Sequence, residues 1–214
     1  MKINEFEKKR MIEKTEYDFL CACVGNGEAT ELQINYYYDT EDEYFRRNNI
    51  TCRIRQKDRR LVGTVKRHGV GGQNQHSSEE RFKVNNLPHS FEVDARKVYL
   101  KGLLITQRLE VELCSKLCLV LDKNSYLGEI DYEIEIEYQE GCEQMVEGVM
   151  VLMEKMLYTE EGKNKVLSKS ERFFRRLSSL PGQAQSKSKG QGSDPDAYMQ
   201  REVLTNKGEQ HGRT

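Results

Sequence analysis

The sequence has no long hydrophobic run and almost no net charge. No stretch approaches the roughly 18 consecutive apolar residues that predict a membrane-spanning helix. The 34 basic and 35 acidic residues give a formal net charge of −1, which favours neither a nucleic-acid binder nor an acidic solvating tail. The N-terminal residues also lack the apolar segment of a signal peptide. These absences predict a cytoplasmic protein that binds neither membrane nor nucleic acid.

The motifs of several enzyme classes are absent as well. The six cysteines include no C-x-x-C pair, which argues against a zinc site, and in a reducing cytosol they would act as small apolar residues. The four histidines all fall in predicted loops or in the C-terminal tail, which disfavours a histidine base or metal ligand. No G-x-S-x-G, P-loop or G-x-G-x-x-G motif occurs. Carboxylates are therefore the candidate metal ligands.

The composition predicts one folded domain, 1–179, followed by a disordered polar tail, 180–214. The tail contains the low-complexity segment 183–193, which buries too little apolar area to offset the loss of chain entropy on folding. Apolar periodicity predicts helices in the folded domain, including a last helix with Phe173 and Phe174 facing inward. The expected helices cover residues 13–23, 143–157 and 170–177, with a short one within 91–100.

The most regular feature of the chain is a set of strands with one apolar and one polar face. In 131–138 four acids alternate with Tyr and Ile, and in 50–55 two arginines lie opposite a cysteine and an isoleucine. Such a face is usually solvated, but here acids and arginines are segregated, and like charges on one strand face repel unless something compensates them. We therefore expect an α+β fold: a closed antiparallel barrel with a polar lumen that holds bound cations and anions, and helices packed outside it.

The N-terminal segment places Glu5, Glu7 and Lys9 on one face of a strand. Two carboxylates and one ammonium on a shared face suit a divalent cation beside a phosphate. A single E-x-E-x-K pattern is weak evidence, but further motifs follow it in order. These are the segments 35–40 (NYYYDT), 50–55 (ITCRIR), 64–66 (TVK), 121–128 with Asp122, 133–135 (EIE) and 168–173 (SKSERF).

On these residues the chain resembles the CYTH superfamily, also called the triphosphate tunnel metalloenzymes, from Ile3 to about Leu177. The resemblance implies an eight-stranded antiparallel tunnel that binds a triphosphate and a divalent metal, Mg²⁺ or Mn²⁺, in its lumen. It implies metal-binding acids at Glu5, Glu7, Asp122, Glu133 and Glu135, with Glu5, Glu7, Glu133 and Glu135 as the catalytic set. It also implies phosphate-binding bases at Lys9, Arg53, Arg55, Lys66, Arg108 and Lys169.

The sequence leaves two assignments of the family's acidic residues open. The parity of Phe82 and Val84 turns Glu79, Arg81 and Lys83 inward, but the family's acid in this strand could be Glu79 or Glu80. Glu137 extends the acidic stripe of its strand, so the metal pair could be Glu135 and Glu137 instead of Glu133 and Glu135.

The resemblance implies a metal-dependent triphosphatase that acts on inorganic triphosphate or on an organic triphosphate such as thiamine triphosphate. One alternative is a class IV-type adenylate cyclase, which would use the same tunnel with the ribose 3′-hydroxyl as nucleophile. The other is a non-catalytic module that binds a triphosphate or polyphosphate; the metal-binding acids favour an enzyme over this module. The sequence leaves the substrate, the preferred metal and the oligomeric state open.

Overall fold

The structure, a computed structural model, describes residues 5–24, 31–68, 78–157 and 166–181. The predicted tail lies outside the described residues from 182 onward, as does the segment 69–77. The chain divides into two units, Met1–Arg175 and Arg176–Thr214. The sheet and the charged cluster described below belong to the first unit.

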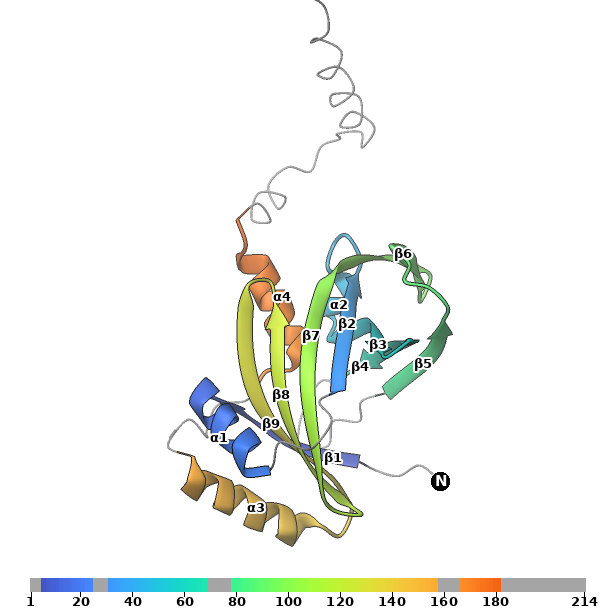
Figure 1. Cartoon of the computed structure of the whole chain (residues 1–214). Coiled ribbons are helices and arrows are strands. Elements are labelled where there is room, and N and C mark those ends of the chain that lie inside the picture. Colours follow the sequence, from blue (N-terminus) through green and yellow to red (C-terminus); the bar gives the residue numbers. More distant parts are fainter. Residues whose placement is uncertain (1–4, 25–30, 69–77, 158–165, 182–214) are drawn as a thin grey trace, which may run out of the picture. The chain divides into compact units, whose positions relative to one another are not determined.

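The described residues form one antiparallel sheet of nine strands (Figure 1). Eight strands follow each other in the order β1-β9-β8-β7-β2-β3-β4-β5, and β6 pairs with the N-terminal part of the long strand β7. The strands are β1 (Glu5–Ile12), β2 (Glu31–Asp39), β3 (Ile50–Lys57), β4 (Arg60–Arg67), β5 (Ser78–Val84), β6 (Ser90–Val93), β7 (Arg96–Cys114), β8 (Leu117–Tyr126) and β9 (Glu129–Gln139).

The antiparallel sheet was expected, but two details of the prediction differ. Within the described residues no backbone ladder joins the edge strands β1 and β5, so the sheet is not closed by hydrogen bonds. The short helix expected within 91–100 is wrong, because β6 ends at Val93 and β7 begins at Arg96. Asp94 and Ala95 both have positive φ angles (52° and 56°), the left-handed conformation of a tight hairpin turn. The strand before this turn, β6, is the ninth strand of the sheet, in addition to the eight that were expected.

The predicted long helices are present, within one or two residues at each end. They are α1 (Lys14–Val24), α3 (Glu143–Met156) and α4 (Lys169–Ser179), with a four-residue helix, α2 (Tyr44–Arg47), between β2 and β3. Leu20 of α1 and Val146 and Met153 of α3 belong to one apolar cluster with residues of β7, β8 and β9. A second cluster joins Phe45 of α2 to the other half of the sheet. In the described part of the chain, no helix combines the length and hydropathy that crossing a membrane requires.

The register of the strands places the polar side chains on the other face of the sheet. Directly opposed residues point to the same side of a sheet. Arg108 is opposite Asp122, which is opposite Glu133, so these three share a face. Their neighbours along each strand, such as Leu121 and Ile134, point into the apolar cluster beneath the helices. Burial of the apolar face thus forces the charged residues together on the opposite one.

A bulge in β7 lies where the last helix packs against the sheet. The pairing of β2 with β7 shifts register between Tyr37 and Tyr38, next to Gly102, which has a φ of 149°. The Phe173 ring packs against Tyr37, with 4.9 Å between ring centroids, and is fully buried. A Cβ atom on Gly102 would lie 2.8 Å from this ring. Glycine is therefore required here by both backbone conformation and space.

We expect Gly102→Ala to destabilise the fold by about 1–3 kcal/mol, because it strains the backbone and displaces Phe173. Gly148→Ala is the matched control: it lies within α3 with nothing near its added Cβ, and alanine there should stabilise the helix by about 0.5–1 kcal/mol. Thermal and urea unfolding of both variants measure the difference. Equal stability of Gly102→Ala and wild type would contradict the proposed docking of Phe173.

Candidate active site

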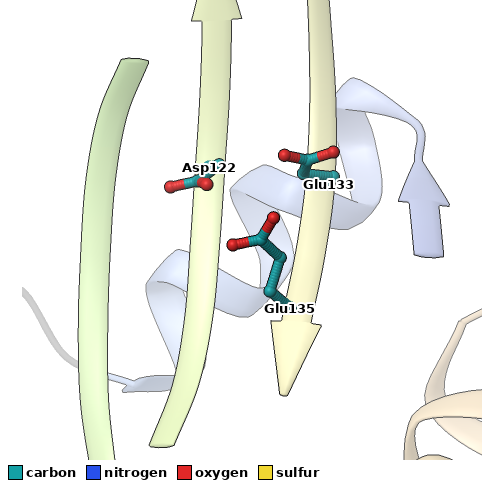
Figure 2. A group of neighbouring side chains, drawn as sticks. All are labelled: Asp122, Glu133 and Glu135. Carbon is teal, nitrogen blue, oxygen red and sulfur yellow. The ribbon is translucent and has the colours of Figure 1, made fainter. Parts of the chain in front are cut away.

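Three buried carboxylates meet on the polar face of the sheet (Figure 2). Asp122 comes from β8, and Glu133 and Glu135 come from β9. One oxygen from each lies within 4.8 Å of the others, and the three side chains turn toward one another. The three residues are at most 5% exposed. We call this cluster the acid triad.

Three cations surround the acid triad. The Arg108 guanidinium donates to Asp122 through Nε (2.9 Å) and Nη2 (2.6 Å), and to Glu135 (2.7 Å). The Lys169 ammonium lies 2.8 Å from Asp122 and 2.9 Å from Glu135, and it also contacts Glu133. Arg172 donates to Glu133 at 2.8 Å. Three carboxylates and three cations therefore balance in formal charge, which offsets the cost of burying them.

These charges shift the ionisation of their neighbours. Burial by itself would raise the pKa of Glu135, but the charges of Lys169 and Arg108 outweigh it and hold this pKa at about 2. Burial would lower the pKa of Lys169, but Glu133, Asp122 and Glu135 raise it above its ordinary value. The pKa of Arg108 is raised in the same way by Asp122, Glu135 and Glu137. All three groups are therefore charged at neutral pH.

The ion pairs of Glu135 should make the stability of the fold depend on acid pH. Its pKa is lowered on folding, so its contribution is fully present above the ordinary value of 4.5 and is lost as the pH falls toward 2. At a pH above 4.5 we expect the free energy of unfolding of Glu135→Gln to be about 3 kcal/mol lower than that of wild type. This difference should vanish as the pH approaches 2.

Urea unfolding of both proteins across this pH range measures the difference. The exposed carboxylate Glu92 on β6 gives the control variant Glu92→Gln, which should follow the wild type at every pH. A constant gap between wild type and Glu135→Gln would contradict the assigned ion pairs.

The other half of the polar face is basic. Arg53 and Arg55 lie on β3 and Lys66 on β4, and none of the three forms an ion pair with a carboxylate among the described residues. Burial, followed by the positive charges of Arg53 and Arg108, lowers the pKa of Arg55 to about 10. All three are half-buried, and cations withdrawn from water without acidic partners are unfavourable unless an anion binds beside them.

Two further residues of β2 belong to this basic half. Asn35 is fully buried, and its Oδ1 accepts a 2.9 Å hydrogen bond from Arg55 Nε, which leaves the two terminal nitrogens of that guanidinium available for a ligand. Tyr37 lies close enough to Arg53, Lys169, Arg55 and Arg172 for their charges to oppose the rise in its pKa that burial causes. Tyr37 thus lies where the basic half meets the acid triad.

The structure does not bring Glu7 of the N-terminal strand into the acid triad, and the side chain of Glu5 lies outside the described part. Glu7 is opposite Glu137 in the register, and its carboxylate pairs with Lys9 at 2.9 Å instead of joining the triad. Lys9 is opposite Glu135 and helps to lower its pKa. Of the four expected metal acids whose side chains are described, three form the triad and Glu7 lies beyond it, because β1 meets β9 with Glu7 opposite Glu137.

The register separates the alternatives for the remaining strands. Glu79 is opposite Lys66 and pairs with Arg81 at 2.6 Å, whereas Glu80 is opposite Val65 and lies 3.7 Å from Arg67. Glu79 therefore shares the polar face and Glu80 points away from it. Lys83 and Arg81 are exposed on the edge strand β5.

On β9 the acid triad contains Glu133 and Glu135, and Glu137 lies beyond it, 3.2 Å from Arg108. Burial, with the nearby Glu135 and Glu110, raises the pKa of Glu137 although Arg108 opposes this.

Two residues that support the triad, Arg172 and Asp131, were not among the predicted site residues. Arg172 bridges Glu133 and Asp131, and Asp131 accepts further hydrogen bonds from Asn124 (3.0 Å) and Tyr126 (2.7 Å). The signal for Arg172 was present in the sequence, since it follows Lys169 by three residues and thus shares a face of the same helix. Asp131 carried no such signal beyond its place in the alternating strand.

The acid triad fits a hard divalent cation. Its donors are carboxylate oxygens, which Mg²⁺ and Mn²⁺ prefer, and they converge from two adjacent strands. Lys169 lies among these oxygens in the present structure. A cation at the triad would therefore have to exchange with this ammonium.

A model of the CYTH domain matches residues 4–167. The chain therefore belongs to the CYTH domain family. It is 30% identical over 176 residues to a Bacillus subtilis (strain 168) protein named "Putative triphosphatase YjbK", an alignment that spans 76% of this chain and 92% of that protein.

Solved structures share the fold. A "putative adenylate cyclase" from Bacillus halodurans superposes with a TM-score of 0.61 at 24% identity, covering 79% of this chain and 97% of that one. The Hippeastrum protein HpAC1, a "putative adenylyl cyclase" described as having a dominant triphosphatase activity, superposes with a TM-score of 0.59 at 19% identity, covering 80% and 94%.

Proposed function

We propose that this protein is a divalent-metal-dependent triphosphatase that hydrolyses inorganic triphosphate or an organic triphosphate such as thiamine triphosphate. The observation that carries the proposal is the division of one sheet face into a buried acid triad and a basic half whose cations have no acidic partners among the described residues. A triphosphate carries several negative charges and needs both a metal and several bases around it. Similarity to YjbK supports the same activity.

The two halves of the face have separate roles in this proposal. Arg53, Arg55 and Lys66 bind phosphate oxygens, with Asn35 holding the Arg55 guanidinium in place. Asp122, Glu133 and Glu135 hold Mg²⁺ or Mn²⁺, which when bound neutralises phosphate charge and lowers the pKa of a bound water. Glu5 and Glu7 of β1 complete the acidic side, and β1 and β5 approach to close the tunnel around the substrate.

The proposal is tested by measuring phosphate release from inorganic triphosphate, thiamine triphosphate and ATP, each with Mg²⁺ and with Mn²⁺. We expect metal-dependent release from at least one triphosphate, and none from Glu133→Gln, which controls for contaminating phosphatases. Formation of cyclic AMP from ATP would instead identify a cyclase. Tight triphosphate binding without turnover under any condition would identify a binding module and contradict the proposal.

Arg53→Ala and Arg55→Ala should raise KM and lower kcat, because each loses a bidentate contact to phosphate worth on the order of 2 kcal/mol. Arg→Lys at either position should rescue only in part, because lysine lacks the planar fork of the guanidinium. Steady-state kinetics measure both parameters, with Arg59→Ala in the exposed β3–β4 turn as the control. Full rescue by lysine at both positions would show that charge alone matters there.

A further inference from the structure

Lys169 differs from the other two cations at the acid triad in its ionic partners. Each ionic partner that the structure gives Lys169 is a triad member: Asp122, Glu133 and Glu135. Arg108 and Arg172 have acidic partners outside the triad, Arg108 in Glu137 and Glu110 and Arg172 in Asp131. Loss of the triad contacts would therefore leave both arginines paired, and Lys169 alone without a partner among the described residues.

The side chain of Lys169 can move while its helix stays in place. Lys169 is the first residue of α4, and the same helix is fixed by Arg172 and by Phe173, which is buried against Tyr37 and beside Gly102. The lysine side chain is a flexible four-carbon stem, so its ammonium can leave the carboxylates and contact other groups by a change of rotamer alone. Ser170, the residue after Lys169, lies 3.3 Å from Thr51 of β3 between their hydroxyl oxygens, and Tyr37, which packs against Phe173 of the same helix, is opposite Arg53. The start of α4 therefore lies beside the strand that carries Arg53 and Arg55.

We propose that Lys169 is an exchangeable counter-ion: its ammonium fills the acid triad until a divalent cation takes that place, and it then turns to the phosphates of the substrate. This inference rests on the proposed function for the identity of the anion. The three carboxylates keep a cation among them in both states, since the ammonium leaves as the metal enters. It also explains how one lysine can contact carboxylates in this structure and still serve as a phosphate-binding base.

Exchange predicts that the lysine and the metal compete. In full-length, chelator-treated protein without any triphosphate, Lys169→Met should bind Mn²⁺ roughly tenfold or more tightly than wild type, because no ammonium has to be displaced. Isothermal titration calorimetry with Mn²⁺ measures this directly. Lys169→Arg keeps the charge and should bind Mn²⁺ no more tightly than wild type. Lys8→Met, which removes a lysine paired with Glu147 away from the triad, should match the wild type.

Folding of the variant gives a second readout. Lys169→Met leaves three buried carboxylates with fewer cations, so Mn²⁺ should raise its melting temperature more than that of wild type. If Lys169→Met is unfolded without metal, recovery of the folded state on addition of Mn²⁺ supports exchange. Failure of Mn²⁺ to restore it, or equal Mn²⁺ affinity of folded Lys169→Met and wild type, overturns the proposal.

The second half of the exchange is measured with the non-hydrolysable imido analogue of triphosphate. This analogue should increase the Mn²⁺ affinity of wild type and of Lys8→Met more than that of Lys169→Met, since only the first two have an ammonium to transfer. An equal increase in all three proteins would show that Lys169 does not reach the phosphates. Neither measurement requires turnover, so absence of triphosphatase activity would remove the proposed function without deciding the exchange.

Discussion

The charge balance at the acid triad is the interaction on which the site depends. Three carboxylates are buried side by side, and the positive charges of Arg108, Lys169 and Arg172 offset the cost of burying them together. Two of these cations come from α4 and one from β7, so a helix near the end of the folded part and a central strand are held to the same point. The docking of α4 against the Gly102 bulge is thus also an electrostatic requirement of the sheet.

The same balance makes the site responsive to ligands. A cluster that is already neutral gains little from an added metal unless one of its own cations leaves, and Lys169 is the cation with no other acidic partner among the described residues. The basic half has the opposite character, since Arg53, Arg55 and Lys66 form no ion pair with a carboxylate in the described part of the chain. One face of the sheet therefore has a displaceable lysine among carboxylates, next to basic side chains that lack ion-pair partners. A metal–triphosphate complex is complementary to both parts, because its metal binds carboxylates and its phosphates bind the bases.

Much of this arrangement was predictable, and the reason is strand parity. Alternation alone placed Glu133 and Glu135 on one face of β9 and Arg53 and Arg55 on one face of β3, because side chains of a strand alternate with a period of two. The helices followed from apolar periodicity, and the CYTH resemblance proposed from ordered motifs is confirmed by the family match. The helix expected within 91–100 was wrong because the apolar runs on either side of the tight turn are short. Runs of this length do not show whether the apolar residues repeat with the period of a helix or of a strand.

Which residues share a face of a strand follows from the sequence alone, whereas which of them meet depends on how the strands and α4 pack together. Parity says nothing about register between strands, so it could not show that Glu7 lies beside Glu137 and outside the triad, or that Glu79, which parity turned inward, lies opposite Lys66. It also could not assign partners to residues of a helix distant in the chain. Lys169 was predicted to bind phosphate, but its place among three carboxylates, and the support of those carboxylates by Arg172, depend on where α4 docks. Docking is fixed by long-range packing of Phe173 into the space above Gly102, which no local pattern encodes.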